Sequence, residues 1–247
     1  MAAYTSFSNI LPDPSNPIGP GGQPLTTGNG GLTGPGFASV QIESTNPTQV
    51  SVTNSGRTIT RSTAGHIFGI NITYNPMTRA QFEPVYNFLA DKKGRLKPFF
   101  VELPHQILSR NAAFGTYAAS NNITTSGVAA QGTAHLLTIN HSSTQTTSPQ
   151  PGDMFTISDT NDSLHTKSYR VTRVMTNADY HSGLHSQPTS TQRIIYFNPP
   201  LQRSVATGQQ LDFSPKIRVV LKSDVQAYTL STNNLYSFSL NLLEAQA

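Results

Sequence analysis

One segment combines a helical pattern with a strand on either side, and this combination restricts the fold more than any other feature. Between Thr78 and Gly94, apolar side chains recur at the i, i+3, i+4 and i+7 spacing of a single helix face. Thr78 followed by Gln81 predicts a capping box, and Gly94 predicts the helix end. The residues of the apolar face are Phe82, Val85, Tyr86 and Leu89.

Pro84 lies inside this pattern and complicates the start of the helix. Proline lacks the N–H group that an interior helical residue donates, so it costs one hydrogen bond. The helix therefore either kinks at Pro84 or begins nearer Glu83.

The rest of the chain is dominated by strand patterns. Residues 65–75 place Phe68, Ile70, Ile72 and Tyr74 on one face at period two, and residues 48–63 predict a hairpin turning at Asn54-Ser55-Gly56. Segments 97–103, 216–224 and 235–244 also read as strands. The sequence thus predicts a mainly-β fold, a split β-barrel or sandwich with one flanking helix.

The spacing of these strands predicts a discontinuous domain. Residues 213–247 contain long strands but no helix or core of their own, so we expect them to pair with the strands of residues 37–110. Residues 111–212 carry several short strand patterns between polar loops, and they predict an inserted small β-barrel or sandwich.

Residues 1–36 form an extended N-terminal arm in this interpretation. They contain 6 Pro and 8 Gly residues, a composition that does not build a packed core. The arm is either a loose tail or a segment that becomes ordered on a neighbouring subunit. Its candidate anchors are Tyr4, Phe7, Ile10 and Leu11.

Charge is scarce in this protein. Charged residues make up 11% of the 247 residues, and Ser, Thr, Asn and Gln together account for 89. There is no Cys, so neither disulfides nor thiolate chemistry are available. No apolar run is long enough to span a membrane, and the N-terminus does not resemble a signal peptide, which predicts synthesis and use in the cytoplasm.

One basic cluster stands out within the net charge of +4. It follows the predicted helix, where cations favour the C-terminal end of the helix dipole. The cluster is either a solvated helix end or a contact with an acidic neighbour, protein or DNA. It comprises Lys92, Lys93, Arg95 and Lys97.

No constellation of residues indicates catalysis, a cofactor or a metal. His181 and His185 are four residues apart, but the Glu of a helical zinc-protease motif is missing. Asp159 and Asp162 lack the remaining ligands of a calcium loop. We therefore predict that the chain is not an enzyme, binds no cofactor or metal, and recognises no specific nucleic-acid sequence.

The order of elements resembles bacteriophage tail-tip and baseplate proteins, in particular distal tail proteins and related tube-initiating components. The resemblance covers about residues 60–245 and rests on order rather than on one motif. It is carried by "HIFGINITYNPMT", "RAQFEPVYNFLADKKGR" and "KPFFVELP", then "PGDMFTI", "YRVTRV" and "IIYFNPPLQ", then "NNLYSFSLNLLEA". The chain departs from the family in having no Trp.

This resemblance implies a structural virion protein that assembles in the host cytoplasm. It implies a ring, six copies being expected, that joins the tail tube to the hub or peripheral baseplate proteins, with DNA passing transiently through its channel. Two other functions remain open. A sugar-binding β module would need exposed Trp or Tyr platforms, and a receptor-binding tail fibre is usually trimeric and repetitive, whereas we find no repeat.

Overall fold

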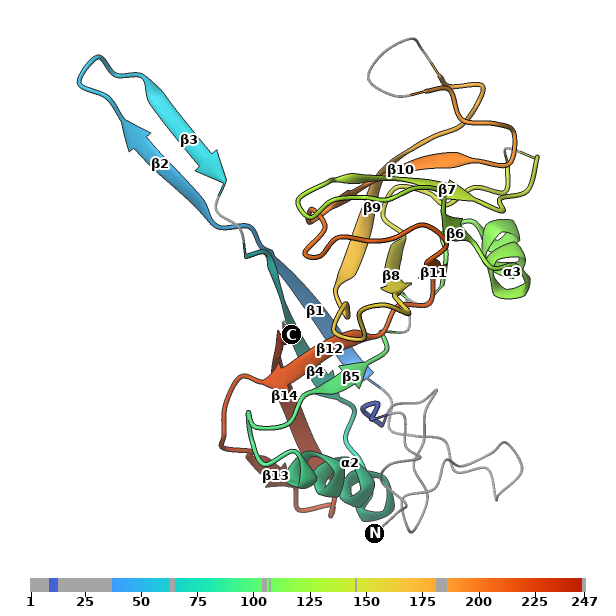
Figure 1. Ribbon diagram of the computed structural model, residues 1–247. Coiled ribbons are helices and arrows are strands. Elements are labelled where there is room, and N and C mark those ends of the chain that lie inside the picture. The colour runs from blue at the N-terminus through green and yellow to red at the C-terminus, as the bar shows by residue number, and fades with distance from the viewer. Residues whose placement is uncertain are drawn as a thin grey trace. The chain divides into compact units, whose positions relative to one another are not determined.

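The computed structural model describes residues 9–12, 37–62, 65–103, 106, 108–144, 146–180 and 186–245. It is mainly β, with 39% strand and 11% helix, which confirms the predicted fold class. The chain divides into two compact units (Figure 1). The described residues up to Val101, with Arg218–Ala245, form the sheet unit, and Glu102–Ile217 form the barrel unit. The sequence instead predicts that the inserted unit covers residues 111–212.

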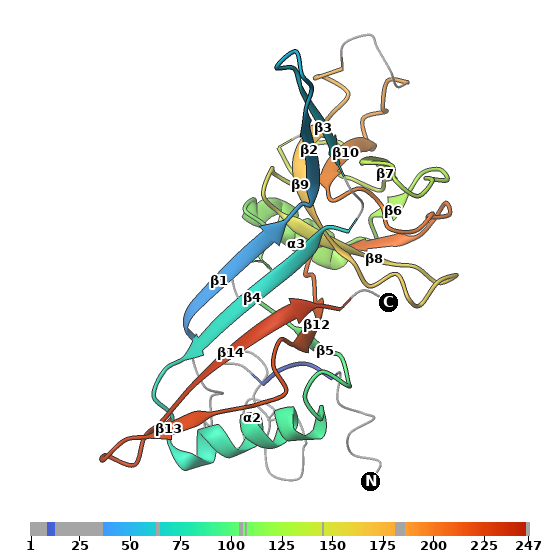
Figure 2. The same cartoon turned by 90° about the vertical axis from the view of Figure 1, so that its left-hand side faces the viewer.

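The sheet unit contains strands from both ends of the chain. Its order is β1-β4-β14-β12-β5, and β13 pairs with the start of β14 (Figure 2). These strands form an open sheet within one chain. Their bounds are β1 Phe37–Thr45, β4 Ile67–Tyr74, β5 Phe99–Val101, β12 Ile217–Leu221, β13 Tyr228–Leu230 and β14 Tyr236–Glu244.

One face of this sheet is apolar, and helix α2, Arg79–Asp91, packs against it at the end where β13 lies (Figure 2). Period-two alternation sends every second side chain of β4 and β14 to this face. The Phe82 ring of α2 lies 4.5 Å from the Tyr236 ring and 5.8 Å from the Phe238 ring, both on β14. The buried strand residues are Phe68, Ile70, Ile72, Tyr74, Phe238, Leu240 and Leu242.

The predicted helix face is largely confirmed. Phe82, Val85 and Leu89 are buried, Tyr86 is half-buried, and Phe88 is a buried residue that the predicted stripe lacks. Phe88 packs edge-on against Phe99 at 5.5 Å between ring centroids, so the helix buries a wider face than the four-residue pattern indicated.

The helix begins where the capping box predicted, and Pro84 does not delay it. Gln81 Oε1 accepts a hydrogen bond from the Thr78 backbone N–H at 3.1 Å. The helix runs from Arg79 through Pro84, so the alternative start near Glu83 is wrong. The missing N–H of Pro84 costs one bond of the helix, and the buried residues on both sides of it offset that cost.

Strands β2, Thr48–Val52, and β3, Thr58–Ser62, form the predicted hairpin between β1 and β4. The pair makes a separate two-stranded sheet, as Figure 2 shows. Gly56 lies in the turn with φ +78°, a left-handed conformation that Gly adopts without the steric cost of a side chain. Every residue of β2 is exposed.

The barrel unit is a closed six-stranded barrel of order β10-β7-β6-β11-β8-β9. Its core is a separate cluster of aliphatic and aromatic side chains, in which the Phe155 ring lies 5.5 Å from the Phe197 ring and 5.6 Å from the Tyr169 ring. The strand bounds are β6 Thr124–Thr125, β7 His135–Ile139, β8 Met154–Ser158, β9 Ser168–Met175, β10 Arg193–Asn198 and β11 Gln210–Asp212.

The barrel unit also contains a second helix, α3, Ala112–Ser120, which contradicts the prediction of a single helix. Asn111 caps it by accepting a hydrogen bond from the Phe114 N–H, and Phe114 is fully buried. Ala, Gly, Ser and Thr fill most of this helix, so it shows almost no amphipathic periodicity. The sequence features that indicate this helix are the capping Asn111 and the two pairs of Ala residues in the segment.

Arg193 is the largest fully buried side chain of the barrel unit. Its guanidinium donates to Ser148 Oγ at 2.8 Å and to the Ser142 carbonyl at 2.9 Å. Two more bonds reach the Ser190 and Gln192 carbonyls. Arg193 thus joins the loop that follows β7 to the loop that precedes β10.

His141 lies beside this cation and is held neutral. The ring is 2% exposed, and its Nε2 lies 2.7 Å from Thr138 Oγ1. Burial, and to a lesser extent the Arg193 charge, lowers the pKa of His141 to about 3 from its usual 6.5. The unfolded chain therefore binds a proton at mildly acidic pH that the folded barrel does not bind.

For this reason we expect the barrel to become less stable as the pH is lowered. Below pH 6.5 the free energy of unfolding of the barrel should decrease through His141 by about 1.4 kcal/mol per pH unit, down to about pH 3. The measurement is amide hydrogen exchange of β10, corrected for intrinsic rates, in the wild type and in His141→Gln. The difference in opening free energy between the two proteins should change by about 2 kcal/mol from pH 6.5 to pH 5. A difference that stays constant over this range would show that His141 is not buried neutral.

Candidate functional site

In the part of the chain that the structure describes, β1 is the end strand of the sheet. Among the described residues, no strand pairs with β1 on the side opposite β4. At the other end of the sheet residues 9–12 cover β5, because Ile10 bridges Phe100 in a parallel arrangement and the Leu11 N–H donates to the Phe100 carbonyl at 2.7 Å. An edge of nine residues with unpaired backbone groups is a template for pairing with another chain.

The hairpin beside this edge exposes aliphatic side chains. Val50 and Val52 share one face of the ribbon, and Ile59, opposite Ser51, lies on the other. Their exposed fractions are 61%, 64% and 51%. A two-stranded ribbon is marginally stable alone in water, so a partner surface would stabilise it.

A cluster of tyrosines at the β13 end of the sheet forms a second exposed surface. Tyr86 of α2 and Tyr236 of β14 are half-buried, and Tyr228 of β13 is 48% exposed. The Tyr228 ring lies 5.5 Å from Tyr86 and 5.7 Å from Tyr236, and all three surround Phe82. Leu230, 50% exposed, lies on the same strand. Tyrosines of this kind are enriched at the centres of protein interfaces.

These two surfaces lie at opposite ends of the sheet. Thr45, which leads to the hairpin, is paired with Ile67 at the start of β4. β13 pairs with the start of β14, which runs beside the end of β4 because Ser239 is paired with Thr73. The hairpin of one chain is therefore remote from the tyrosine cluster of the same chain.

The face of β1, β4 and β14 opposite α2 is polar and almost uncharged. Strand pairing aligns side chains of β1, β4 and β14 in three rows of three residues, which gives nine positions on this face. At these nine positions there is no Lys or Arg, and the only charged residue is Glu43, which accepts a hydrogen bond from Asn71 Nδ2 at 3.3 Å. The rows are Ser39–Thr73–Ser239, Gln41–Asn71–Asn241 and Glu43–Gly69–Leu243.

The basic cluster does not form one free surface. Lys92 is buried, and its Nζ contacts Asn9 Oδ1 at 2.5 Å and Asp91 Oδ2 at 3.4 Å, which corrects the expectation that it faces a neighbour. Burial lowers the pKa of Lys92, and the Asp91 carboxylate opposes that shift. Within its own chain, Lys92 holds residues 9–12 in place through its bond to Asn9.

The three other basic residues are exposed. Arg95 donates from its backbone N–H to Asp224 Oδ1 at 3.0 Å and from its guanidinium to the Lys222 carbonyl. Lys97 lies 3.3 Å from Asp91 Oδ1, while the side chain of Lys93 makes no such contact among the described residues. It remains a prediction that Lys93, Arg95 and Lys97 contact a neighbouring subunit.

The predicted arm anchors are separated by the structure. Ile10 and Leu11 are 5% and 0% exposed within their own chain, so the expectation that they anchor on a neighbouring subunit is wrong. The physical reason is that residues 9–12 extend the sheet beyond β5, and their apolar side chains enter its core. Tyr4 and Phe7 lie outside the described residues.

The described residues contain no group of three or more His, Asp or Glu side chains that could hold a metal ion. Asp159 and Asp162 accept backbone hydrogen bonds in turns, at 2.9 Å from Asn161 and 3.0 Å from Leu164. His181 and His185 lie outside the described part of the chain. In that part, neither helix has the length and apolar character to cross a membrane.

Comparison of the sequence with protein-family models and with curated proteins found no match.

Proposed function

We propose that this chain is a structural subunit of a bacteriophage tail tip or baseplate. In this proposal identical copies associate side by side into a closed ring, six copies being expected, that joins the tail tube to hub or peripheral proteins. The chain acts without catalysis and has its place in the virion. The resemblance in element order described above supports this assignment.

The open edge of β1 is the observation that carries the proposal. A nine-residue edge that no described residue pairs with, beside a hairpin with exposed Val and Ile, leaves hydrogen-bonding and apolar groups that another copy can satisfy. The hairpin and the tyrosine cluster are different surfaces at opposite ends of the sheet. A contact between them is therefore head-to-tail, and repetition of such a contact closes a ring when the rotation allows it.

The polar rows fit the inner wall of such a ring. Hydroxyl and amide groups hydrate well, and the absence of cations at the nine positions removes the charge attraction that dominates the binding of phosphate groups. DNA would then pass along this face without being held. The protein needs no specific nucleic-acid recognition in this role.

Sedimentation velocity of the full chain over a concentration series tests the proposal. We expect one discrete oligomer, with the mass of six copies of the 26.7 kDa chain, to replace the monomer as concentration rises. A protein that stays monomeric up to its solubility limit would contradict the proposal. An unlimited series of oligomers would contradict ring closure.

A further inference from the structure

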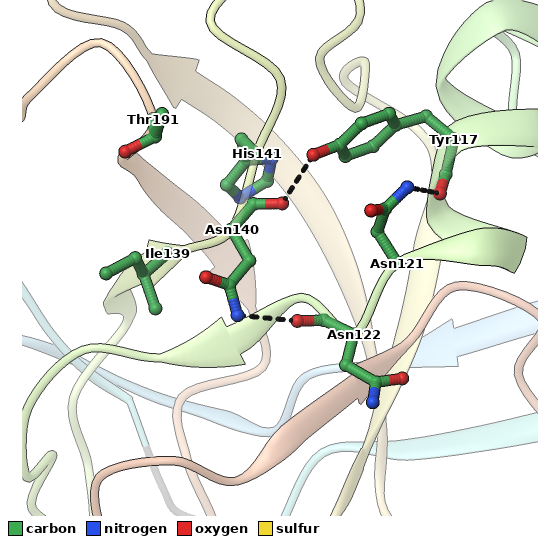
Figure 3. Close-up of a pocket in the computed structure, with 7 residues that line it drawn as sticks. All are labelled: Tyr117, Asn121, Asn122, Ile139, Asn140, His141 and Thr191. Carbon is green, nitrogen blue, oxygen red and sulfur yellow. Dashed lines mark hydrogen bonds between the residues drawn. The ribbon is translucent and has the colours of Figure 1, made fainter.

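A polar hollow in the barrel unit has the features of a ligand site that assembly does not require. Its volume is about 400 Å³, within the usual range of small-molecule pockets. Figure 3 shows the residues that line it: Tyr117, Asn121, Asn122, Ile139, Asn140, His141 and Thr191.

Hydrogen bonds between the end of α3 and the end of β7 fix the frame of this hollow (Figure 3). The Tyr117 hydroxyl donates to the Asn140 carbonyl at 3.0 Å, and Asn140 Nδ2 donates to the Asn122 carbonyl at 2.9 Å. Asn121 Nδ2 donates to the Tyr117 carbonyl at 2.9 Å. Asn140 adopts a left-handed φ of +69°, a conformation that few residues other than Gly and Asn tolerate. The wall is therefore held in place before any ligand arrives.

Several polar atoms of the wall remain available. The Asn122 side chain makes no hydrogen bond with the described residues, although an amide group offers both donors and acceptors. The Oδ1 atoms of Asn121 and Asn140 and the hydroxyl of Thr191 also lack a hydrogen bond to the described part of the chain. These groups can donate to and accept from a ligand that carries several hydroxyls.

The lining contains no Asp, Glu, Lys or Arg. His141 is neutral at physiological pH, since burial lowers its pKa to about 3. The lining itself offers no counter-ion to a charged ligand, since the Arg193 cation beside His141 is fully buried and already donates to Ser148 Oγ and to three backbone carbonyls. Tyr117 and Ile139 add apolar surface against which the C–H groups of a sugar ring can pack.

From these observations we propose that the hollow binds a neutral saccharide, with the amides of Asn121, Asn122 and Asn140 hydrogen-bonded to its hydroxyl groups. The site lies wholly within the barrel unit. It is independent of the ring proposed above, so a failure of either proposal leaves the other standing.

The test is a titration of the ¹⁵N-labelled full chain, followed by NMR, with D-glucose, D-galactose, L-rhamnose and N-acetyl-D-glucosamine. We expect at least one of these sugars to cause saturable shifts of the amide signals of Asn121, Asn122 and Asn140. Glucose 1-phosphate, the charged counterpart, should bind about tenfold more weakly than glucose or not at all. The absence of saturable shifts with all four neutral sugars would overturn the proposal, and so would shifts confined to other parts of the chain.

A pair of variants separates the site from the surface in general. Asn122→Ala removes an exposed amide that has no partner among the described residues, so we expect an intact fold and about tenfold weaker binding. Asn161→Ala removes an exposed Asn that does not line the hollow, and it should bind like the wild type. Equal affinity of all three proteins would overturn the assignment of the amides.

Discussion

Leu89→Asp is expected to abolish folding of the sheet unit. Leu89 is 1% exposed on the face of α2 that covers the sheet. The substitution removes a buried side chain at a cost of about 2 to 5 kcal/mol and leaves a carboxylate unpaired in an apolar core. Since domains are stable by roughly 5 to 15 kcal/mol, most of the stability of the sheet unit would be lost.

NMR spectra of the full chain measure this effect unit by unit. The dispersed signals of β4 and β14 should collapse, while those of the barrel should persist, because the barrel has its own core cluster. Ala90→Asp is the matched control, since Ala90 is the next residue of the helix and is exposed. That control should cost only about 1 kcal/mol, because Asp replaces a good helix former near the negative end of the helix, and it should leave the sheet signals in place. A Leu89→Asp protein with native sheet signals would show that α2 does not cover the core.

The double substitution Val50→Lys and Val52→Lys is expected to weaken assembly by at least about 100-fold. Each valine contributes on the order of 1.5 kcal/mol if it is buried by a neighbouring copy, and two contributions of this size change a dissociation constant by more than 100-fold. Unpaired ammonium groups at the contact would add to the loss. Sedimentation velocity over a concentration series measures the shift.

The stability of the isolated chain should not change, because both valines are more than half exposed. Val128→Lys with Leu164→Lys is the matched control on the barrel unit, where exposed aliphatic residues are likewise replaced by two charges. This control should assemble like the wild type. If both double variants assembled equally well, the hairpin would have no part in the contact between copies.

The strong periodicities of the sequence predict the long strands and the helix of the sheet unit. Alternation marked β4, β12 and β14, and the apolar stripe at Phe82, Val85 and Leu89 marked the covered face of α2. β11 and β13 are three residues long, too short for any period to appear. α3 was missed because small residues give it no apolar face.

The contact residues were harder to predict than the elements. Lys92 follows α2 in a run of basic residues and reads as a solvated cation, yet Asn9 and Asp91 bind it in a buried position. Ile10 lies in a Gly- and Pro-rich stretch that reads as an arm, yet it bridges β5. Both misplacements come from one long-range contact, the pairing of residues 9–12 with Phe100, which no local pattern encodes.

The polar rows and the amide hollow were also beyond local reasoning. Thr73, Ser39 and Ser239 become neighbours only when β1, β4 and β14 are in register. Likewise, Asn122 and Asn140 meet because the end of α3 lies beside the end of β7. In the sequence these residues are ordinary members of a chain rich in neutral polar side chains.

A reconstruction of the assembled protein by electron cryomicroscopy tests the central claim most directly. We expect a closed ring of six copies in which the edge of β1 lies against a neighbouring copy and Thr73 and Asn71 face an open channel. Solitary molecules, or an assembly whose contacts avoid β1 and whose hydroxyl and amide rows face outward, would contradict it.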